Sequence, residues 1–157
     1  MKKLFHASFA YAIAGVLSGL YYREFTKVNN FTGESQLGLV HTHWLVLGFI
    51  VLLVVLMLEK VFAISAAAPR LSAWFFWIWN AGVAVTGGMM LVKGTLVVSG
   101  ADAGSKALAG IAGTGHMLLT AGLVLHFLAL RKALAAAAQT AAPLTEAPGR
   151  LPAATKA

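Results

Sequence analysis

Four long runs of apolar residues, separated by short connecting stretches, dominate the pattern along the chain. They cover residues 4–22, 37–62, 71–98 and 107–130. A helix needs about 20 predominantly apolar residues to cross the hydrocarbon core of a bilayer, and each run reaches that length. Residues 45–58 contain no polar side chain, whereas a helix of a soluble bundle would have a polar outer face. The pattern therefore predicts an all-α integral membrane protein, a bundle of four transmembrane helices.

The first apolar run also has a feature of a signal peptide, because Lys2 and Lys3 precede it. No small-x-small cleavage site follows at the right distance, and the residues after it suit an interfacial anchor, so we expect a retained helix. Basic residues flanking the spans favour the side of the N-terminus by six to three, which predicts an N-in/C-in topology. The six are Lys2, Lys3, Lys60, Arg70, Arg131 and Lys132, and the three are Arg23, Lys27 and Lys106.

The end of the chain differs in composition from the apolar runs. After residue 132 it is rich in alanine, contains Pro143, Pro148 and Pro152, and has few bulky apolar side chains. Such a segment cannot bury enough apolar surface to fold alone. We therefore predict a four-helix transmembrane domain over residues 1–132. Residues 133–157 are expected to form an Ala/Pro-rich tail, frayed helix at first and then disordered.

Composition narrows the chemistry that the spans can carry. The chain is 59% hydrophobic and 11% charged, and it has no cysteine. Disulfides, Fe–S clusters, thiolate zinc sites and covalently attached haem are therefore excluded. The net charge of +7 comes from residues spread between apolar runs, so it indicates membrane anchors and not nucleic-acid binding. No hydrolase triad, paired intramembrane carboxylates or phosphate-binding glycine loop is present, and no catalytic residue can be named.

Ionisable side chains inside the predicted spans are the main candidates for function. His41 and His43 lie two residues apart, which places them about 200° apart around a straight α-helix. One metal ion is therefore not easily bound by both. One histidine can face the bundle interior while the other faces a neighbouring helix, a second subunit or a hydrogen-bond partner. Alternatively, one or both are simply buried, neutral and hydrogen-bonded.

The fourth span offers a further histidine, His116, which follows Gly110, Gly113 and Gly115. Small residues leave room for a flat ligand such as a porphyrin, or for a closely packed helix. The second and fourth spans run in the same direction. His43 lies about 9 Å, and His116 about 15 Å, from the outer ends of their spans. Tilt can cover that difference, so a haem b held by both histidines is geometrically allowed.

Lys93 is a charge inside the third span, about 7–8 Å from its outer end. No intramembrane Asp or Glu lies near it in the sequence, so it needs another anion or must extend to the membrane surface. A haem propionate would meet that need, and Arg23 and Lys27 at the outer end of the first span could pair in the same way. His126 and His6 are expected to be interfacial.

Several segments resemble the DUF2871 family of small four-span bacterial membrane proteins. They are residues 22–27 (YREFTK), 40–48 (VHTHWLVLG), 58–60 (LEK), Lys93-Gly94, 110–113 (GIAG) and Gly115-His116. The resemblance covers roughly residues 1–132 and implies a multi-pass protein of the bacterial inner membrane. The family itself implies no known function.

The span with the H-x-H pair is also similar to small four-span proteins related to subunit I of haem–copper oxidases and to NnrS haem proteins. In the oxidase subunit, twelve helices form three four-helix arcs, and the two histidines of one H-x-H pair serve different haems. This chain resembles one arc, so a homotrimer would imitate the whole by fold-level analogy. It lacks the His-x-x-x-Tyr and adjacent His-His ligands of the copper site, so oxygen reduction to water is not expected.

Three functions remain open. The first is a membrane protein that binds b-type haem through His116 and either His43 or His41, with Arg23, Lys93 and Lys27 near the propionates. It would transfer electrons or bind a small gas such as O₂ or NO, as a homo-oligomer in lipid with an electron donor or gas as partner. The second is a copper or zinc module that uses His41, His43 and His116. The third is a structural or assembly subunit without a cofactor.

Overall fold

The computed structural model describes residues 1–141, and within them it is helical throughout, with no strand. The elements are α1 Lys2–Val28, α2 Leu37–His43, η1 Trp44–Ile50, α3 Val51–Phe62, α4 Ile64–Ala67, α5 Pro69–Val98 and α6 Lys106–Ala141. Because α2, η1 and α3 follow one another without a break, they make one continuous helix. Four helices of this part of the chain are long and apolar enough to cross a membrane, as the apolar runs predicted.

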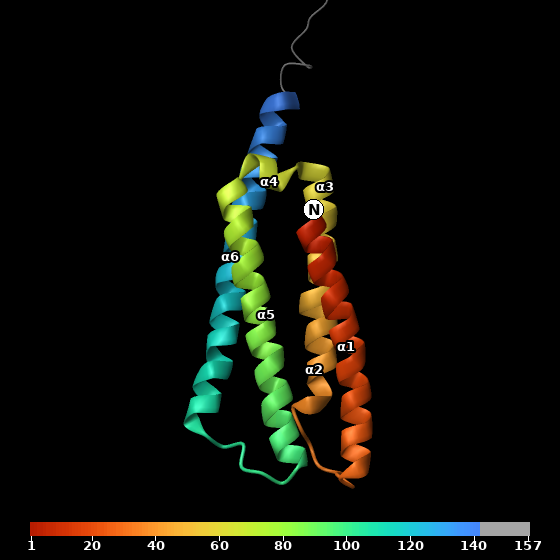
Figure 1. Cartoon of the computed structure of the whole chain (residues 1–157). Helices are drawn as coiled ribbons and strands as arrows, with labels where there is room; N and C mark the ends of the chain where they lie inside the picture. Colours follow the sequence, from red (N-terminus) through yellow and green to blue (C-terminus); the bar gives the residue numbers. More distant parts are fainter. Residues whose placement is uncertain (142–157) are drawn as a thin grey trace, which may run out of the picture.

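The four long helices run alternately down and up, joined by short connections (Figure 1). The α1 helix packs along α2, η1 and α3, and α5 packs along α6. No Cα atom of α1 lies within 8 Å of a Cα atom of α6, whereas α5 contacts both α2 and α6. The second span and α5 therefore form the middle of the bundle, with α1 and α6 on its two outer sides. The N-terminus lies at the same end as the last turns of α6 (Figure 1).

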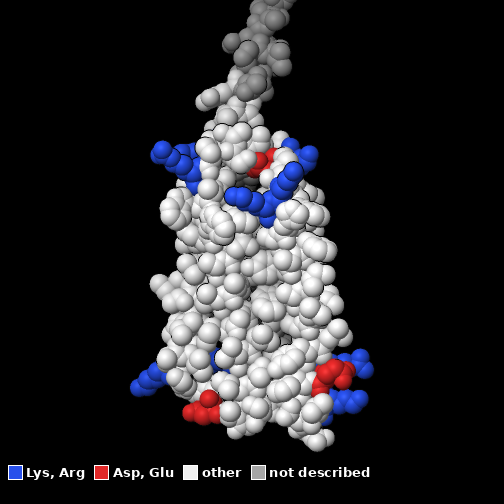
Figure 2. Space-filling model, in the orientation of Figure 1, with Lys and Arg blue, Asp and Glu red and all other residues white. Residues whose placement is uncertain are grey.

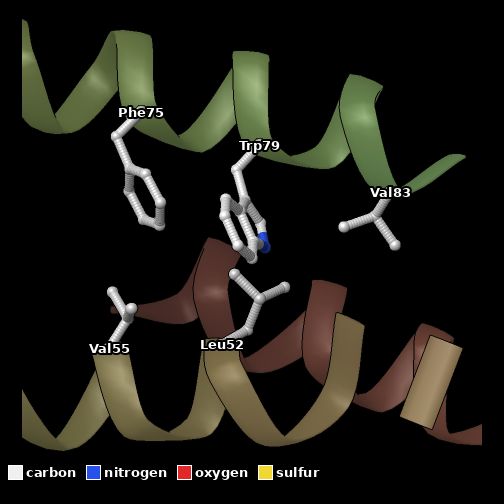
Figure 3. Close-up of a cluster of buried hydrophobic side chains, with 5 residues drawn as sticks. All are labelled: Leu52, Val55, Phe75, Trp79 and Val83. Atoms are coloured by element: carbon white, nitrogen blue, oxygen red, sulfur yellow. The ribbon is translucent and has the colours of Figure 1, made fainter. Parts of the chain in front are cut away.

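The largest buried cluster joins the second span to α5 at mid-bundle. Figure 3 shows Leu52 and Val55 of α3 facing Phe75, Trp79 and Val83 of α5. Two smaller clusters lie toward the ends, one around Ile64 and Ala129 and the other around Leu37 and Val98. Many other large apolar side chains are exposed on the outer faces of the helices, which suits helices with lipid as their solvent.

Glycines allow the helices of the middle layer to approach backbone to backbone. A Cβ atom added at Gly94 of α5 would collide with the backbone of Leu37, and one at Gly82 would lie 2.9 Å from the backbone nitrogen of Leu119. Without a hydrophobic drive between helices in lipid, such close packing is a main source of their association. These glycines fix where α5 lies between α2 and α6.

The second span contains a π-helical segment that the sequence did not predict. Within η1, the backbone N–H of Val51 donates to the carbonyl of Val46, five residues earlier. The indole N–H of Trp79 donates to the carbonyl of Leu47 at 3.1 Å, and Gly48 lies against the ring of Tyr11. Contacts from two neighbouring helices thus accompany the wider turn, and π-helical turns often mark functional sites.

Charged side chains gather at the two ends of the molecule and leave an apolar band between them (Figure 2). The bounds of the helices place the six basic residues of the predicted inner side at the end with the N-terminus. Arg23, Lys27 and Lys106 lie at the opposite end. The band and the two charged ends match a protein that spans a bilayer, while the direction of insertion stays a prediction.

The α6 helix continues past residue 132 to Ala141, over the part of the predicted tail where frayed helix was expected. Ala133 is buried in the cluster with Ile64 and Ala68, whereas residues 134–139 are exposed. Residues 142–157 of the predicted tail lie outside the described residues. Between the second and third spans lies α4, which begins after Ala63 in the left-handed conformation (φ 47°).

Candidate functional site

The two histidines of the H-x-H pair have different surroundings. His41 lies against α1, where a Cβ atom added at Gly19 would be 3.6 Å from the His41 Cβ. Its Nε2 is 3.2 Å from the hydroxyl of Thr42, and its Nδ1 is buried without a hydrogen-bond partner. The buried Nδ1 and the contact with Gly19 place this histidine in the α1–α2 interface.

His43 has one ring nitrogen in contact with the backbone of its own helix. Its Nδ1 lies 3.0 Å from the carbonyl oxygen of Leu39, one turn earlier in α2. Because a carbonyl can only accept, Nδ1 carries a hydrogen in this contact, and the tautomer with that hydrogen has its lone pair on Nε2. Histidine ligands commonly donate their other ring N–H to a carbonyl in this way, which fixes the tautomer and the ring orientation.

His116 repeats this arrangement on the outer surface of α6. Its Nδ1 lies 3.3 Å from the carbonyl of Ala112, and its side chain is exposed. A Cβ atom added at Gly110 or at Gly113 would meet nothing within 4 Å, so the surface beside the imidazole is open. Gly115 differs, because a Cβ atom added there would lie 2.9 Å from the backbone nitrogen of Thr86 in α5. Gly110 and Gly113 therefore leave open space beside His116, whereas Gly115 allows α6 to pack closely on α5.

The chain does not bring His43 and His116 directly together. No Cα atom of α2 lies within 8 Å of a Cα atom of α6, and α5 contacts both helices. Within residues 1–141, no group of three or more His, Asp or Glu side chains is close enough to hold a metal ion. The three histidines His41, His43 and His116 thus do not form a ready metal-binding set in one copy of the chain.

The basic residues predicted near the outer end differ in their exposure and in whether they already have an ion-pair partner. Lys93 of α5 is half-buried and makes no ion pair within the described residues. Arg23 lies 3.7 Å from the carboxylate of Glu24, with both side chains largely exposed. Lys27 is exposed in the last turn of α1. Lys93 is therefore the basic residue that most needs an anion, and the contact of Arg23 with its sequence neighbour was not predicted.

A second group of functional side chains lies at the other end of the bundle and was not predicted as a site. Glu59 and His126 line a cavity of about 240 Å³ there, together with Ser65 and Ser72. The available signal was Glu59 itself, an acid at the end of an otherwise apolar span with a serine six residues later. His126, expected at the interface, is in fact buried against Phe75.

Comparison with known families gives a match over most of the chain. The model of a family described as a protein of unknown function (DUF2871) matches residues 1–133. The match includes every residue of both groups described above and confirms the resemblance based on the sequence motifs. No curated protein and no solved structure matches the chain.

Proposed function

The chain belongs to the DUF2871 family, and from that premise we propose that it is a histidine-ligated, b-type haem-binding protein of the bacterial inner membrane. The single observation that carries the proposal is the environment of His116. Its imidazole lies on an open helix surface beside Gly110 and Gly113, and the Nδ1 contact with a carbonyl leaves the lone pair on Nε2. Neutral imidazole nitrogen is the common axial ligand of haem iron.

His43 is the candidate for a second ligand. It has the same Nδ1–carbonyl contact as His116, whereas Nε2 of His41 faces Thr42. Because α5 contacts both α2 and α6 in one chain, we place the meeting of His43 and His116 between two copies of a homo-oligomer. This also agrees with the trimer expected from the likeness to one arc of haem–copper oxidase subunit I, which is a fold-level analogy.

The charge of Lys93 supports the same proposal. A half-buried ammonium without an ion pair is costly within a span, and a carboxylate of the ligand would offset that cost. Exposed Arg23 and Lys27 would add weaker, screened contacts. When bound, haem supplies a one-electron redox change or a coordination position for a small gas. The chain supplies the ligand nitrogen, its orientation and a cation.

The test is an optical spectrum of the protein purified from cells grown with ample haem. A Soret band should survive purification and be lost or strongly reduced in His116→Ala. His6→Ala is the matched control, because His6 is an exposed histidine at the other end, and it should leave the band unchanged. A colourless wild-type protein would contradict the proposal.

The spectrum also separates the two other functions. A colourless protein that retains copper or zinc in elemental analysis would favour a metal module, which has less support because no three-ligand group is assembled in the described part of the chain. A protein that retains neither haem nor metal, and whose histidine variants fold normally, would favour a structural subunit.

A further inference from the structure

The cavity at the N-terminal end of the bundle has the properties of a ligand site separate from the proposed haem site. It encloses about 240 Å³ between α1, α3, α4, α5 and α6. Figure 2 shows acidic atoms recessed in a hollow at this end of the molecule. A single water needs only about 10–15 Å³ measured in this way, so the cavity has room for a small organic molecule.

Glu59 places a buried carboxylate in the wall of this cavity. Only 7% of the residue is exposed, and the carboxylate accepts hydrogen bonds from the backbone N–H of Ser65, at 2.9 Å, and from the Ser65 hydroxyl. The left-handed turn at Ala63 brings Ser65 back over the end of α3. Within residues 1–141, no Lys, Arg or His nitrogen lies within 4.0 Å of the carboxylate. The carboxyl group is therefore buried without a cationic neighbour in the described chain, and a buried charge without a partner is costly.

Two further polar groups line the cavity without partners. The hydroxyl of Ser72 is buried and makes no hydrogen bond. His126 is 8% exposed, and its contacts are with the rings of Phe75, 4.8 Å away between centroids, and Phe127. Buried polar groups are nearly always hydrogen-bonded, so the unpartnered Ser72 hydroxyl, in a cavity that also contains the Glu59 carboxylate, indicates a ligand that supplies donors.

The walls of the cavity indicate what kind of cation fits. They include the rings of Phe75, Phe76 and Trp77 and the apolar side chains of Leu4 and Ile64. Aromatic rings attract organic cations, and a carboxylate forms charge-assisted hydrogen bonds with N–H donors. We propose that this cavity binds a small organic cation with a primary ammonium group, and that Glu59 is its counter-ion. The ammonium donates to Glu59 and Ser72, while its carbon chain lies against the aromatic wall.

The experiment uses the full-length protein in nanodiscs of phosphatidylcholine, a lipid without a primary amine, titrated at pH 7 with ethylammonium chloride. Isothermal calorimetry should give a saturable signal above that of sodium chloride at equal ionic strength. Glu59→Gln should weaken the affinity by about tenfold or more, because a buried charge loses its partner. Glu24→Gln, at the exposed carboxylate of the opposite end, is the control and should bind like the wild type.

A wild-type protein without saturable binding, or a folded Glu59→Gln that binds equally well, overturns the proposal. Ser72→Ala keeps it testable if Glu59→Gln does not fold, because the Ser72 hydroxyl makes no hydrogen bond whose loss would destabilise the protein. Ser72→Ala should weaken ethylammonium binding several-fold with unchanged thermal unfolding. An unchanged affinity in this variant contradicts the proposed contact and overturns the proposal.

Two further arms identify the source of the ammonium group. The first arm repeats the ethylammonium titration in nanodiscs of phosphatidylethanolamine. If the apparent affinity for ethylammonium is lower there than in phosphatidylcholine, the lipid headgroup competes for the cavity and is the natural ligand. If the two affinities are equal, the natural ligand is a free amine. Both results support the site. Lys3 also lines the cavity. If ethylammonium binds only after Lys3→Met, the side chain of Lys3 is itself the cation, and the proposal of an external ligand is wrong.

Discussion

At the scale of single residues, the surroundings of a side chain decide its role more than its type does. His41 and His43 are two residues apart, yet the Nδ1 of His41 is buried without a hydrogen-bond partner, whereas the Nδ1 of His43 contacts the carbonyl oxygen of Leu39. The sequence predicted that the two would diverge, because residues i and i+2 point apart on a helix. It could not say which one packs on α1, since that depends on Gly19 of another helix.

The glycines of α5 give a residue-scale prediction about stability. Gly94→Ala places a methyl group against the backbone of Leu37, which cannot move aside as a flexible side chain would. We expect it to lower the free energy of unfolding by about 1–3 kcal/mol. Gly88→Ala in the same helix is the matched control, because its Cβ atom meets nothing within 4 Å. Thermal unfolding in detergent measures both, and an equal effect of the two variants would contradict the packing described.

At the scale of the elements, the spans were predictable and their irregularities were not. A span must be long and apolar because lipid offers no hydrogen bonds, so the ends of the apolar runs lie near the ends of the helices. Trp79 and Tyr11 from other helices contact the π-helical turn of η1, and Ala133 of α6 packs against α4. Neither contact leaves a periodic signal in the sequence.

The π-helical turn leads to a prediction about Trp79. Trp79→Phe removes the indole donor to the carbonyl of Leu47 and leaves a small void in the largest buried cluster. The two effects together should cost about 1–3 kcal/mol of unfolding free energy. Trp74→Phe is the comparison, since Trp74 is 63% exposed on the same helix, and we expect no more than about 0.5 kcal/mol there. A smaller loss for Trp79→Phe than for Trp74→Phe would show that this bond does not support the segment.

At the scale of the whole molecule, the second span and α5 lie in the middle of the bundle, and α1 and α6 lie on its outer sides. The two groups of candidate site residues lie toward opposite ends of the bundle. The candidate haem ligands could be named from the sequence, because histidines are rare in apolar runs. The cavity around Glu59 could not, because five helices from distant parts of the chain converge on it. The arrangement also leaves His116 exposed on an outer helix of the bundle, where no other described histidine of the same chain is brought together with it into a three-ligand group.

The distribution of charge predicts the direction in which the bundle is inserted. Six basic residues at the end with the N-terminus, against three at the other, favour N-in/C-in. A green fluorescent protein fused after residue 141 should fluoresce, and alkaline phosphatase fused in the connection at residues 99–105 should be active. A non-fluorescent first fusion together with an inactive second fusion would contradict this topology and place the Glu59 cavity on the outer face.

The measurement closest to the central claim is a haem titration of the purified apo-protein in nanodiscs, followed by difference absorbance in the Soret region. We predict saturation at a fixed ratio of haem to protein, loss of that saturable binding in His116→Ala, and no change in His6→Ala. The His43→Ala variant should move the spectrum from a low-spin, two-histidine form toward a form with one open position. Saturable binding that is the same in His116→Ala and the wild type would contradict the claim.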